Sequence, residues 1–134
     1  MSVFAKSVLL LLMFTLASAS SNSLFLPTQH TVVTINNTLV GNQDLKIHCK
    51  SRDNDLGVHV LQKYQTFHWG FGISVFGNTL FFCSFQWGNS PLLHYYDVYI
   101  ENRDWLTCDS CRWYIKEDGP CRYEYDHLQC YNWN

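Results

Sequence analysis

Six cysteines carry the most specific chemistry in this chain of 134 residues. They are Cys49, Cys83, Cys108, Cys111, Cys121 and Cys130. Cys108 and Cys111 are separated by two residues, a spacing found in zinc sites and in thioredoxin-like redox pairs. We favour three structural disulfides over both, because an even cysteine count is typical of disulfides in a small exported domain and the pair is not set between a strand and a helix.

Histidines and carboxylates are the other candidates for catalysis or metal binding. The histidines are His30, His48, His59, His68, His94 and His127. His48, His59 and His68 alternate with apolar residues, which predicts the solvent face of strands rather than a ligand set. Asp53 and Asp55 lie in a polar turn, where short acidic side chains bond to backbone amides. Nucleophile-elbow, zinc-protease and phosphate-loop motifs are absent, so we predict no catalytic residue, metal or cofactor, and a hydrolase is the least favoured class.

The N-terminus is typical of a secretory signal peptide. Lys6 supplies a positive charge, residues 8–16 form an apolar core, and Ala17-Ser18-Ala19 fits the small-x-small cleavage pattern. A membrane anchor needs about 20 apolar residues, so this core is too short to span a bilayer. We expect residues 1–19 to be removed and residues 20–134 to form a single secreted domain without a membrane span.

The composition excludes two further classes of protein. Hydrophobic residues make up 47% of the chain, aromatic residues 16% and charged residues 15%, which excludes a disordered segment. The 9 Lys and Arg are outnumbered by 11 Asp and Glu. Because phosphate neutralisation supplies most of the affinity for nucleic acid, this balance argues against a nucleic-acid binder.

Alternating apolar residues predict a series of short β-strands. The expected strands cover residues 31–35, 45–50, 58–60, 66–71, 80–87, 95–100 and 111–116, with a last short piece between residues 121 and 131. Leu45, Ile47 and Cys49 should point inward, and so should Trp113 and Ile115. Turn-forming residues separate the strands at fairly even spacing. The pattern predicts an all-β protein, a small disulfide-bridged antiparallel β-sandwich of about eight strands.

Two of these segments have further consequences for the fold. In residues 58–60, Val58 and Val60 alternate with His59, which predicts that the valines face the core. Residues 80–87 are apolar at both parities, which predicts a central strand covered on both sides.

Aromatic residues are numerous enough that some could form an exposed platform for sugars or a protein partner. We favour an aromatic core.

A series of short strings resembles the plant self-incompatibility protein family, whose members are also called S-protein homologues. The strings are His48-Cys49-Lys50-Ser51, Asp53-Asn54-Asp55-Leu56-Gly57, residues 79–87, Asp97-Val98-Tyr99, Arg103-Asp104, residues 108–113, Gly119-Pro120-Cys121 and Cys130-Tyr131-x-Trp133. Each string alone is weak. Their order and spacing make the resemblance specific, and it covers the chain from about Thr31 to Asn134.

The resemblance implies a small secreted plant protein with a β-sandwich fold and no catalytic activity. It implies a ligand that binds a cell-surface or membrane protein receptor, in some relatives to reject self pollen. It also implies that Cys121 pairs with Cys130, because divergent relatives lack both. The pairing of the other four cysteines stays open. One option is Cys49–Cys83 with Cys108–Cys111, and the other is that Cys49 and Cys83 each pair with one of Cys108 and Cys111. The alternative function is a secreted carbohydrate-binding or defence module.

Two polar segments are the candidates for partner binding. They are Arg52, Asp53, Asn54 and Asp55, and Glu101, Asn102, Arg103 and Asp104. Charges of both signs suit electrostatic recognition, although turn formation and solubility explain the first segment equally well. Asn36-Asn37-Thr38 is the only glycosylation sequon, so Asn36 is the expected glycan acceptor.

Overall fold

The computed structural model describes residues 29–134, so the expected signal peptide at residues 1–19 and its cleavage site lie outside the described residues. The elements run in the order β1 (His30–Asn37), β2 (Leu45–Ser51), β3 (Asp55–Leu61), β4 (Thr66–Gly72), β5 (Leu80–Trp87), β6 (His94–Ile100), α2 (Glu101–Asp104), β7 (Ser110–Lys116), β8 (Gly119–Glu124) and β9 (His127–Cys130). The expected all-β class is confirmed, with nine strands in the described part.

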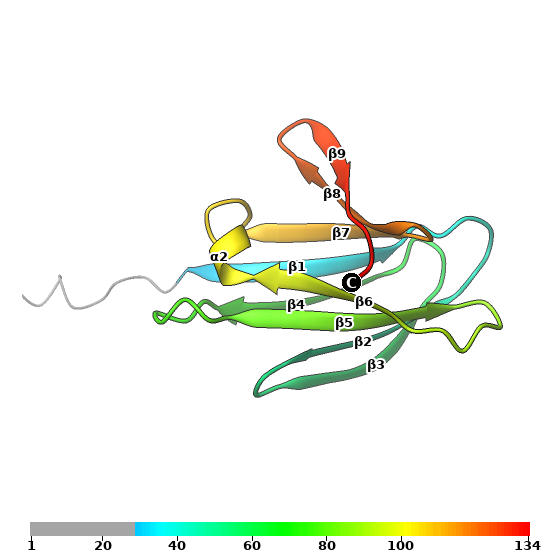
Figure 1. Ribbon diagram of the computed structural model, residues 1–134, viewed down its shortest axis with the longest axis horizontal. Helices are drawn as coiled ribbons and strands as arrows, with labels where there is room; N and C mark the ends of the chain where they lie inside the picture. Colours follow the sequence, from blue (N-terminus) through cyan, green and yellow to red (C-terminus); the bar gives the residue numbers. More distant parts are fainter. Residues whose placement is uncertain (1–28) are drawn as a thin grey trace, which may run out of the picture.

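Two sheets make up the domain (Figure 1). One has five strands in the order β4-β1-β7-β8-β9, and the other has four in the order β3-β2-β5-β6. Neighbouring strands are antiparallel except β1 and β7, which are parallel and align Val33 with Cys111. The sequence predicted an antiparallel sandwich throughout. β1 departs from this because it lies between two strands that run in opposite directions, β4 and β7.

The core lies between the sheets and follows the predicted parity in β2 and β7. Leu45, Ile47, Trp113 and Ile115 are fully buried, and Cys49 is 1% exposed. The Trp113 indole nitrogen donates a 2.8 Å hydrogen bond to the Val98 carbonyl of β6, which satisfies the polar atom of a buried ring. Burial of these alternating residues is the main force that holds the sheets together.

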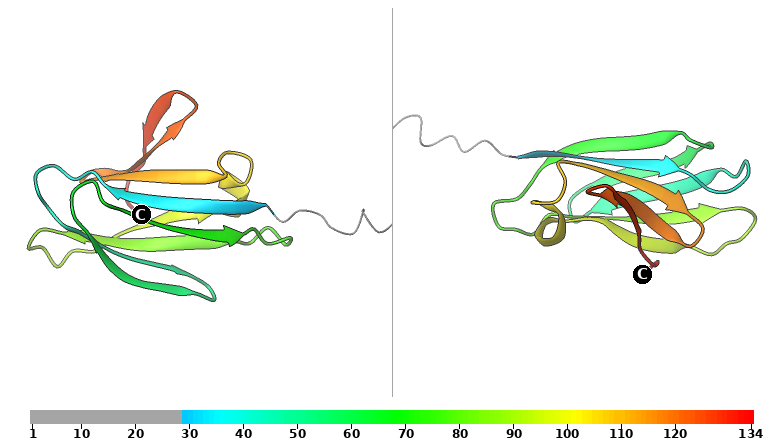
Figure 2. Two further views of the ribbon diagram at one scale, coloured as in Figure 1. Left: turned by 180° about the vertical axis from the view of Figure 1, so that it is seen from behind. Right: turned by 90° about the horizontal axis from the view of Figure 1, so that it is seen from above.

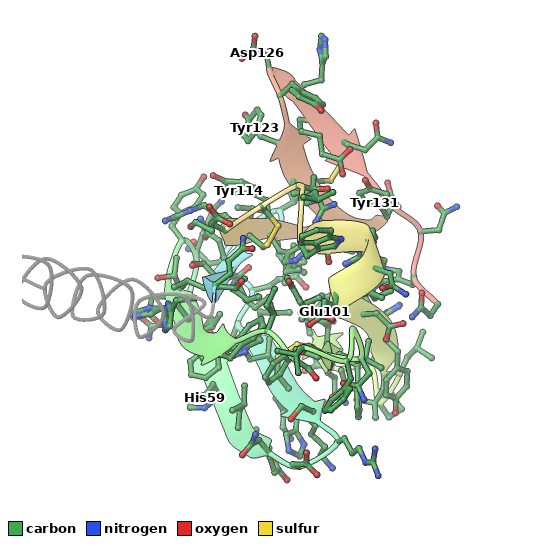
Figure 3. The ribbon with its side chains drawn as sticks, turned by 90° about the vertical axis from the view of Figure 1, so that its left-hand side faces the viewer. His59, Glu101, Tyr114, Tyr123, Asp126 and Tyr131 are labelled. Atoms are coloured by element: carbon green, nitrogen blue, oxygen red, sulfur yellow. A yellow bond between two sulfur atoms is a disulfide. The ribbon has the colours of Figure 1, made fainter. Side chains whose placement is uncertain are left out.

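Strand β3 has the opposite orientation to the one predicted. Val58 is 51% exposed and Val60 is 57% exposed, whereas His59 turns inward and stacks on Phe67 of β4 at 3.9 Å between ring centroids (Figure 3). The register explains the reversal, because His59 lies directly opposite the buried Ile47 and cross-strand partners share a face. As an edge strand, β3 can leave its valines in solvent.

Strand β5 is central in its sheet, as predicted, but only one of its faces is covered. Phe81 and Phe85 are buried against the other sheet, while Leu80 is 40% exposed and Phe82 is 37% exposed. The prediction of cover on both sides was therefore wrong. A two-layer sandwich has no third layer to cover the outer face of a central strand.

The β8–β9 hairpin extends away from the body of the sandwich (Figures 1 and 2). Its base is buried at Gly119, Cys121 and Arg122, whereas every residue of β9 is exposed. Gly119 has a φ of 150°, and a Cβ built on it would lie 1.8 Å from the Tyr131 carbonyl oxygen. Glycine is required here because the C-terminal segment crosses directly over the start of β8.

Candidate functional site

The two predicted partner-binding segments lie at the same end of the sandwich. The strands β2, β5 and β6 are antiparallel neighbours, so the end of β2, the start of β5 and the end of β6 meet, with Ser51 opposite Phe81 and Leu80 opposite Ile100. Three segments therefore gather at this end, namely residues 52–54, 73–79 and 101–109. We call these three segments the loop end. Figure 3 views the molecule from this side, with Glu101 near the middle.

A groove of about 490 Å³ runs between the first two segments. The exposed residues 52–54 line it, and so do Ser74, Asn78 and Thr79 of the second segment. Apolar residues of β5, including Phe82, complete the lining. The turn is fixed by two hydrogen bonds, from Ser51 N to Asn54 O and from Asn54 N to the Ser51 hydroxyl. The groove thus presents both charge signs beside apolar surface.

Asp55 does not line this groove, although it was predicted as part of the same segment. Its carboxylate accepts a 2.9 Å hydrogen bond from Gly57 N and lies 2.6 Å from His48 Nε2. The Gly57 bond, followed by the His48 interaction, lowers the pKa of Asp55 below its usual value. Asp55 therefore closes the β2–β3 turn.

Large apolar side chains are exposed in the other two segments of the loop end. Val75 and Phe76 are each 86% exposed, Leu106 is 79% exposed and Trp105 is 44% exposed. Residues 73–79 approach α2 closely at Gly77. This glycine has a φ of 72°, and a Cβ on it would lie 3.2 Å from a carboxylate oxygen of Glu101 in α2. Val75, Phe76 and Leu106 were missed, because the predicted binding residues were chosen for their charge.

The second predicted segment is largely unavailable to a partner. It forms α2, in which Glu101 is 4% exposed and Asp104 is fully buried. Both residues were predicted as partner-binding candidates, but both are buried in the folded domain. Asn102 remains exposed, and Arg103 remains partly exposed.

Asp104 is the centre of a buried ionic cluster. Arg103 donates from Nε and Nη2 to its two oxygens at 2.8 and 2.7 Å, Arg122 Nη1 donates at 2.7 Å, and Ile100 N donates at 2.9 Å. Burial raises the pKa of Asp104, but the hydrogen bonds from Arg103, Ile100 N and Arg122 outweigh it, so the pKa lies below its usual value. The carboxylate is therefore charged and saturated with donors.

Arg122 extends this cluster into the C-terminal hairpin. It is 4% exposed, its Nε donates a 2.9 Å bond to Glu124, and its guanidinium lies 4.8 Å from the centroid of Trp113. The hydrogen bond from the Tyr131 hydroxyl, followed by Arg122, lowers the pKa of Glu124. The sequence carries no signal for this arrangement, because Arg122 lies on a strand that alternation did not resolve.

The six cysteines form three disulfides. The bridges are Cys49–Cys83, Cys108–Cys111 and Cys121–Cys130. The last is the pairing that the family resemblance implied, and the first two correspond to one of the alternatives left open. Because Cys108 is bonded to Cys111, this pair does not form half of a zinc site. In residues 29–134, His, Cys, Asp and Glu form no group of three that could hold a metal ion.

Asn36 is the last of the predicted site residues. Asn36 lies on β1 and is partly exposed, and the Thr38 hydroxyl of the same sequon donates a 2.8 Å bond to Ile115 O.

Across the part of the chain that the structure describes, no helix is both long and apolar enough to span a membrane.

A family model and curated relatives both match most of this chain. The family model for plant self-incompatibility protein S1 matches residues 32–133. S-protein homolog 5 of Arabidopsis thaliana is 46% identical over 103 residues, which cover 77% of each chain. S-protein homolog 2 of the same plant is 42% identical over 87% of this chain and 75% of its own length.

A solved structure shares the fold. It is described as an SPH (self-incompatibility protein homologue) structure from a widespread family of small, highly stable, secreted plant proteins. It superposes with a TM-score of 0.60 over 80% of this chain and 96% of its own, at 19% identity. The family match and the curated relatives together establish that this chain belongs to the plant self-incompatibility protein S1 family, whose relatives are called S-protein homologs.

Proposed function

We propose that this protein is a secreted, non-enzymatic ligand that recognises a cell-surface protein partner through its loop end. The observation that carries the proposal is the exposure of Val75 and Phe76 within residues 73–79, the segment that lines one side of the charged groove at Arg52 and Asp53. Exposed apolar side chains rimmed by polar ones are typical of protein interaction sites.

The construction of the domain supports this role. The loop end is attached to two sheets, and each sheet contains a disulfide between neighbouring strands, Cys49–Cys83 in one and Cys121–Cys130 in the other. Loops held on a rigid scaffold commonly carry recognition. Apolar side chains at the centre of such a surface supply most of the binding energy, while surrounding charges select the partner. Arg52, Asp53 and Asn102 are among the exposed polar residues at this end that can make that selection.

Catalysis is a weaker explanation for the same surface. The buried carboxylate of Asp104 is already saturated by two arginines, and His48 is engaged by Asp55. A hydrolase would need convergent acid and base groups in a cleft. The groove at the loop end is lined instead by one Arg, one Asp, amides, hydroxyls and apolar side chains.

A matched pair of variants tests the proposal. Val75→Ser changes a valine that is 86% exposed at the loop end, and Val40→Ser changes one that is 75% exposed beyond β1, at the opposite end. Labelled protein should bind plant plasma-membrane vesicles saturably. Unlabelled wild type and Val40→Ser should compete equally, and Val75→Ser should compete about tenfold less well.

The same experiment distinguishes the other functions. Protease treatment of the vesicles should abolish binding if the partner is a protein. Binding that survives protease but is lost after glycan removal would instead favour a carbohydrate-binding module. Non-saturable binding, or equal competition by both valine variants, would refute recognition through the loop end. Rejection of self pollen is a specific form of the proposed function, and a pollen-tube growth assay with added protein tests it.

A further inference from the structure

The three disulfides differ in how far solvent can reach their sulfur atoms. Cys49 and Cys83 are 1% and 0% exposed and lie within the core. Cys111 is equally buried, at 1%, but Cys108 lies in the loop end and is partly exposed. A thiol from solvent can therefore approach one sulfur of this pair and not the other, which is the asymmetry that directs thiol–disulfide exchange to a single atom. The Cys121–Cys130 bridge has the same asymmetry, because Cys121 is 1% exposed and Cys130 on β9 is exposed, so the groups around Cys108 must distinguish the two bridges.

The guanidinium of Arg122 lies close to the accessible sulfur of Cys108. Arg122 Nη1 lies 3.8 Å from Cys108 Sγ, while it also binds Asp104. A positive group at this distance stabilises a thiolate relative to a thiol. Cys111 Sγ instead lies 3.4 Å from the Cys108 carbonyl oxygen, with no cation in contact.

The charges around this disulfide balance, because three arginines face the carboxylates of Asp104, Asp109 and Glu124, but the charged group in contact with Cys108 Sγ is the Arg122 cation. Arg103 and Arg122 offset Asp104 and Glu124, with which they form ion pairs. A cavity of about 210 Å³ opens over the disulfide, and its walls include Arg112 as well as Arg122. At the Cys121–Cys130 bridge, the neighbouring cavity carries Lys116 and Asp118, whose charges offset each other.

We propose that Cys108–Cys111 is an exchangeable disulfide whose substrates are small dithiols. A thiolate of the dithiol attacks Cys108 Sγ, the bond to Cys111 breaks, and the Cys111 sulfur leaves with the electron pair and takes a proton from water. The second thiolate of the reagent attacks the reagent sulfur bonded to Cys108. A cyclic disulfide leaves, and Cys108 is released as a thiolate beside Arg122. The dithiol is oxidised and the protein disulfide is reduced by two electrons.

The fold tolerates this reduction because the bridge closes a very short loop. Its cysteines are 3 residues apart, against 34 for Cys49–Cys83 and 9 for Cys121–Cys130, and short loops add least to stability through the unfolded chain. Cys111 stays in place through its strand pairing with Val33. Cys108 keeps the 3.0 Å hydrogen bond from its N–H to Asp104 O.

Graded reduction of the full secreted chain tests the order of opening. The protein is incubated with increasing dithiothreitol, trapped with iodoacetamide, and mapped by peptide mass spectrometry. We expect a species in which Cys108 and Cys111 are both alkylated while the other two bridges remain and the circular dichroism spectrum is unchanged. Reduction of all three bridges together, or of Cys121–Cys130 first, would overturn the proposal.

A charge variant tests the role of Arg122. In selectively reduced protein at neutral pH, Arg122→Gln should slow alkylation of Cys108 about tenfold, because less of the sulfur is thiolate. Arg52→Gln removes the same charge from an exposed site in the loop end and should change the rate less than about twofold. Equal rates in wild type and Arg122→Gln would contradict the assignment. If Arg122→Gln does not fold, the order of reduction in the wild type still decides whether the disulfide is exchangeable.

Discussion

Arg122 on β8 and Asp104 at the end of α2 form a 2.7 Å ion pair from which solvent is almost completely excluded. Arg103 binds the same carboxylate, and the guanidiniums of both arginines lie within 5.7 Å of the Trp113 ring centroid. The pair joins the C-terminal hairpin to the loop end through the interior of the protein. Its desolvated position makes the loss of one partner costly, because the remaining charge would stay buried.

Removing the carboxylate should strongly destabilise the domain. Asp104→Ala removes the buried carboxylate that Arg103 and Arg122 share and leaves only Glu124 as a counter-ion, so we expect a loss of about 3–5 kcal/mol in the free energy of unfolding measured with urea. Asp53→Ala removes a carboxylate from an exposed turn and should change stability by less than about 0.5 kcal/mol. A loss below about 1 kcal/mol for Asp104→Ala would mean that the cluster contributes little.

Acid should unfold the protein through the same cluster. The pKa values of Asp104 and Glu124 are both lower in the folded state than in the unfolded chain. Their contribution to stability is therefore complete above the unfolded value near 4 and is lost as pH falls through the folded values.

Urea midpoints measured as a function of pH check this direction. We expect an almost constant midpoint between about pH 7 and 5 and a steep fall below about pH 4. Asp104→Asn should flatten the fall, whereas Asp53→Asn should retain it. A wild-type midpoint that rises in acid would have the wrong sign for these two carboxyls.

Two glycines with positive φ separate the effect of crowding from that of backbone strain. Gly119→Ala places a Cβ 1.8 Å from the Tyr131 carbonyl oxygen, and Gly41→Ala, at a φ of 76°, meets nothing within 4 Å. We expect losses of about 3 kcal/mol or more for Gly119→Ala and about 1 kcal/mol for Gly41→Ala. Thermal unfolding of both variants measures the difference, and similar melting temperatures would show that the C-terminal segment moves aside freely.

Glycosylation at Asn36 should occur before folding is complete. The Thr38 hydroxyl is bonded to Ile115 O in the folded chain, so the sequon is most accessible before β7 pairs with β1. Protein from a plant secretory host should show a glycan mass that disappears in Asn36→Gln and Thr38→Ala and persists in Thr38→Ser. An unmodified wild type would show that β1 closes before the oligosaccharide is attached.

The sequence predicted the parts of the fold that depend on local alternation. The inward residues of β2 and β7 were correct because both strands bury one face of a sheet. In β3 the same pattern failed, because its orientation depends on the register of His59 opposite Ile47. Valine content alone does not show which side of an edge strand faces the core.

The candidate site was predictable only in part. Arg52 and Asp53 were correctly placed in an exposed turn, because residues 52–54 form a polar turn between β2 and β3. Asp104 was misplaced because its partner, Arg122, is 18 residues away in the sequence and meets it only through tertiary packing. Exposure of Phe76 was also missed, since an aromatic residue in a loop looks the same in sequence whether it is buried or not.

The parallel pairing of β1 with β7 determines the order in which the protein can form during synthesis. All four strands of the β3-β2-β5-β6 sheet lie within residues 45–100, and β1 can pair with β4 once Gly72 has emerged. The other edge of β1 stays unpaired until residues 110–115 are made. An apolar strand with a free edge is a template for wrong pairing between chains, so we expect β1 to be the segment most prone to misassembly in a nascent or truncated chain.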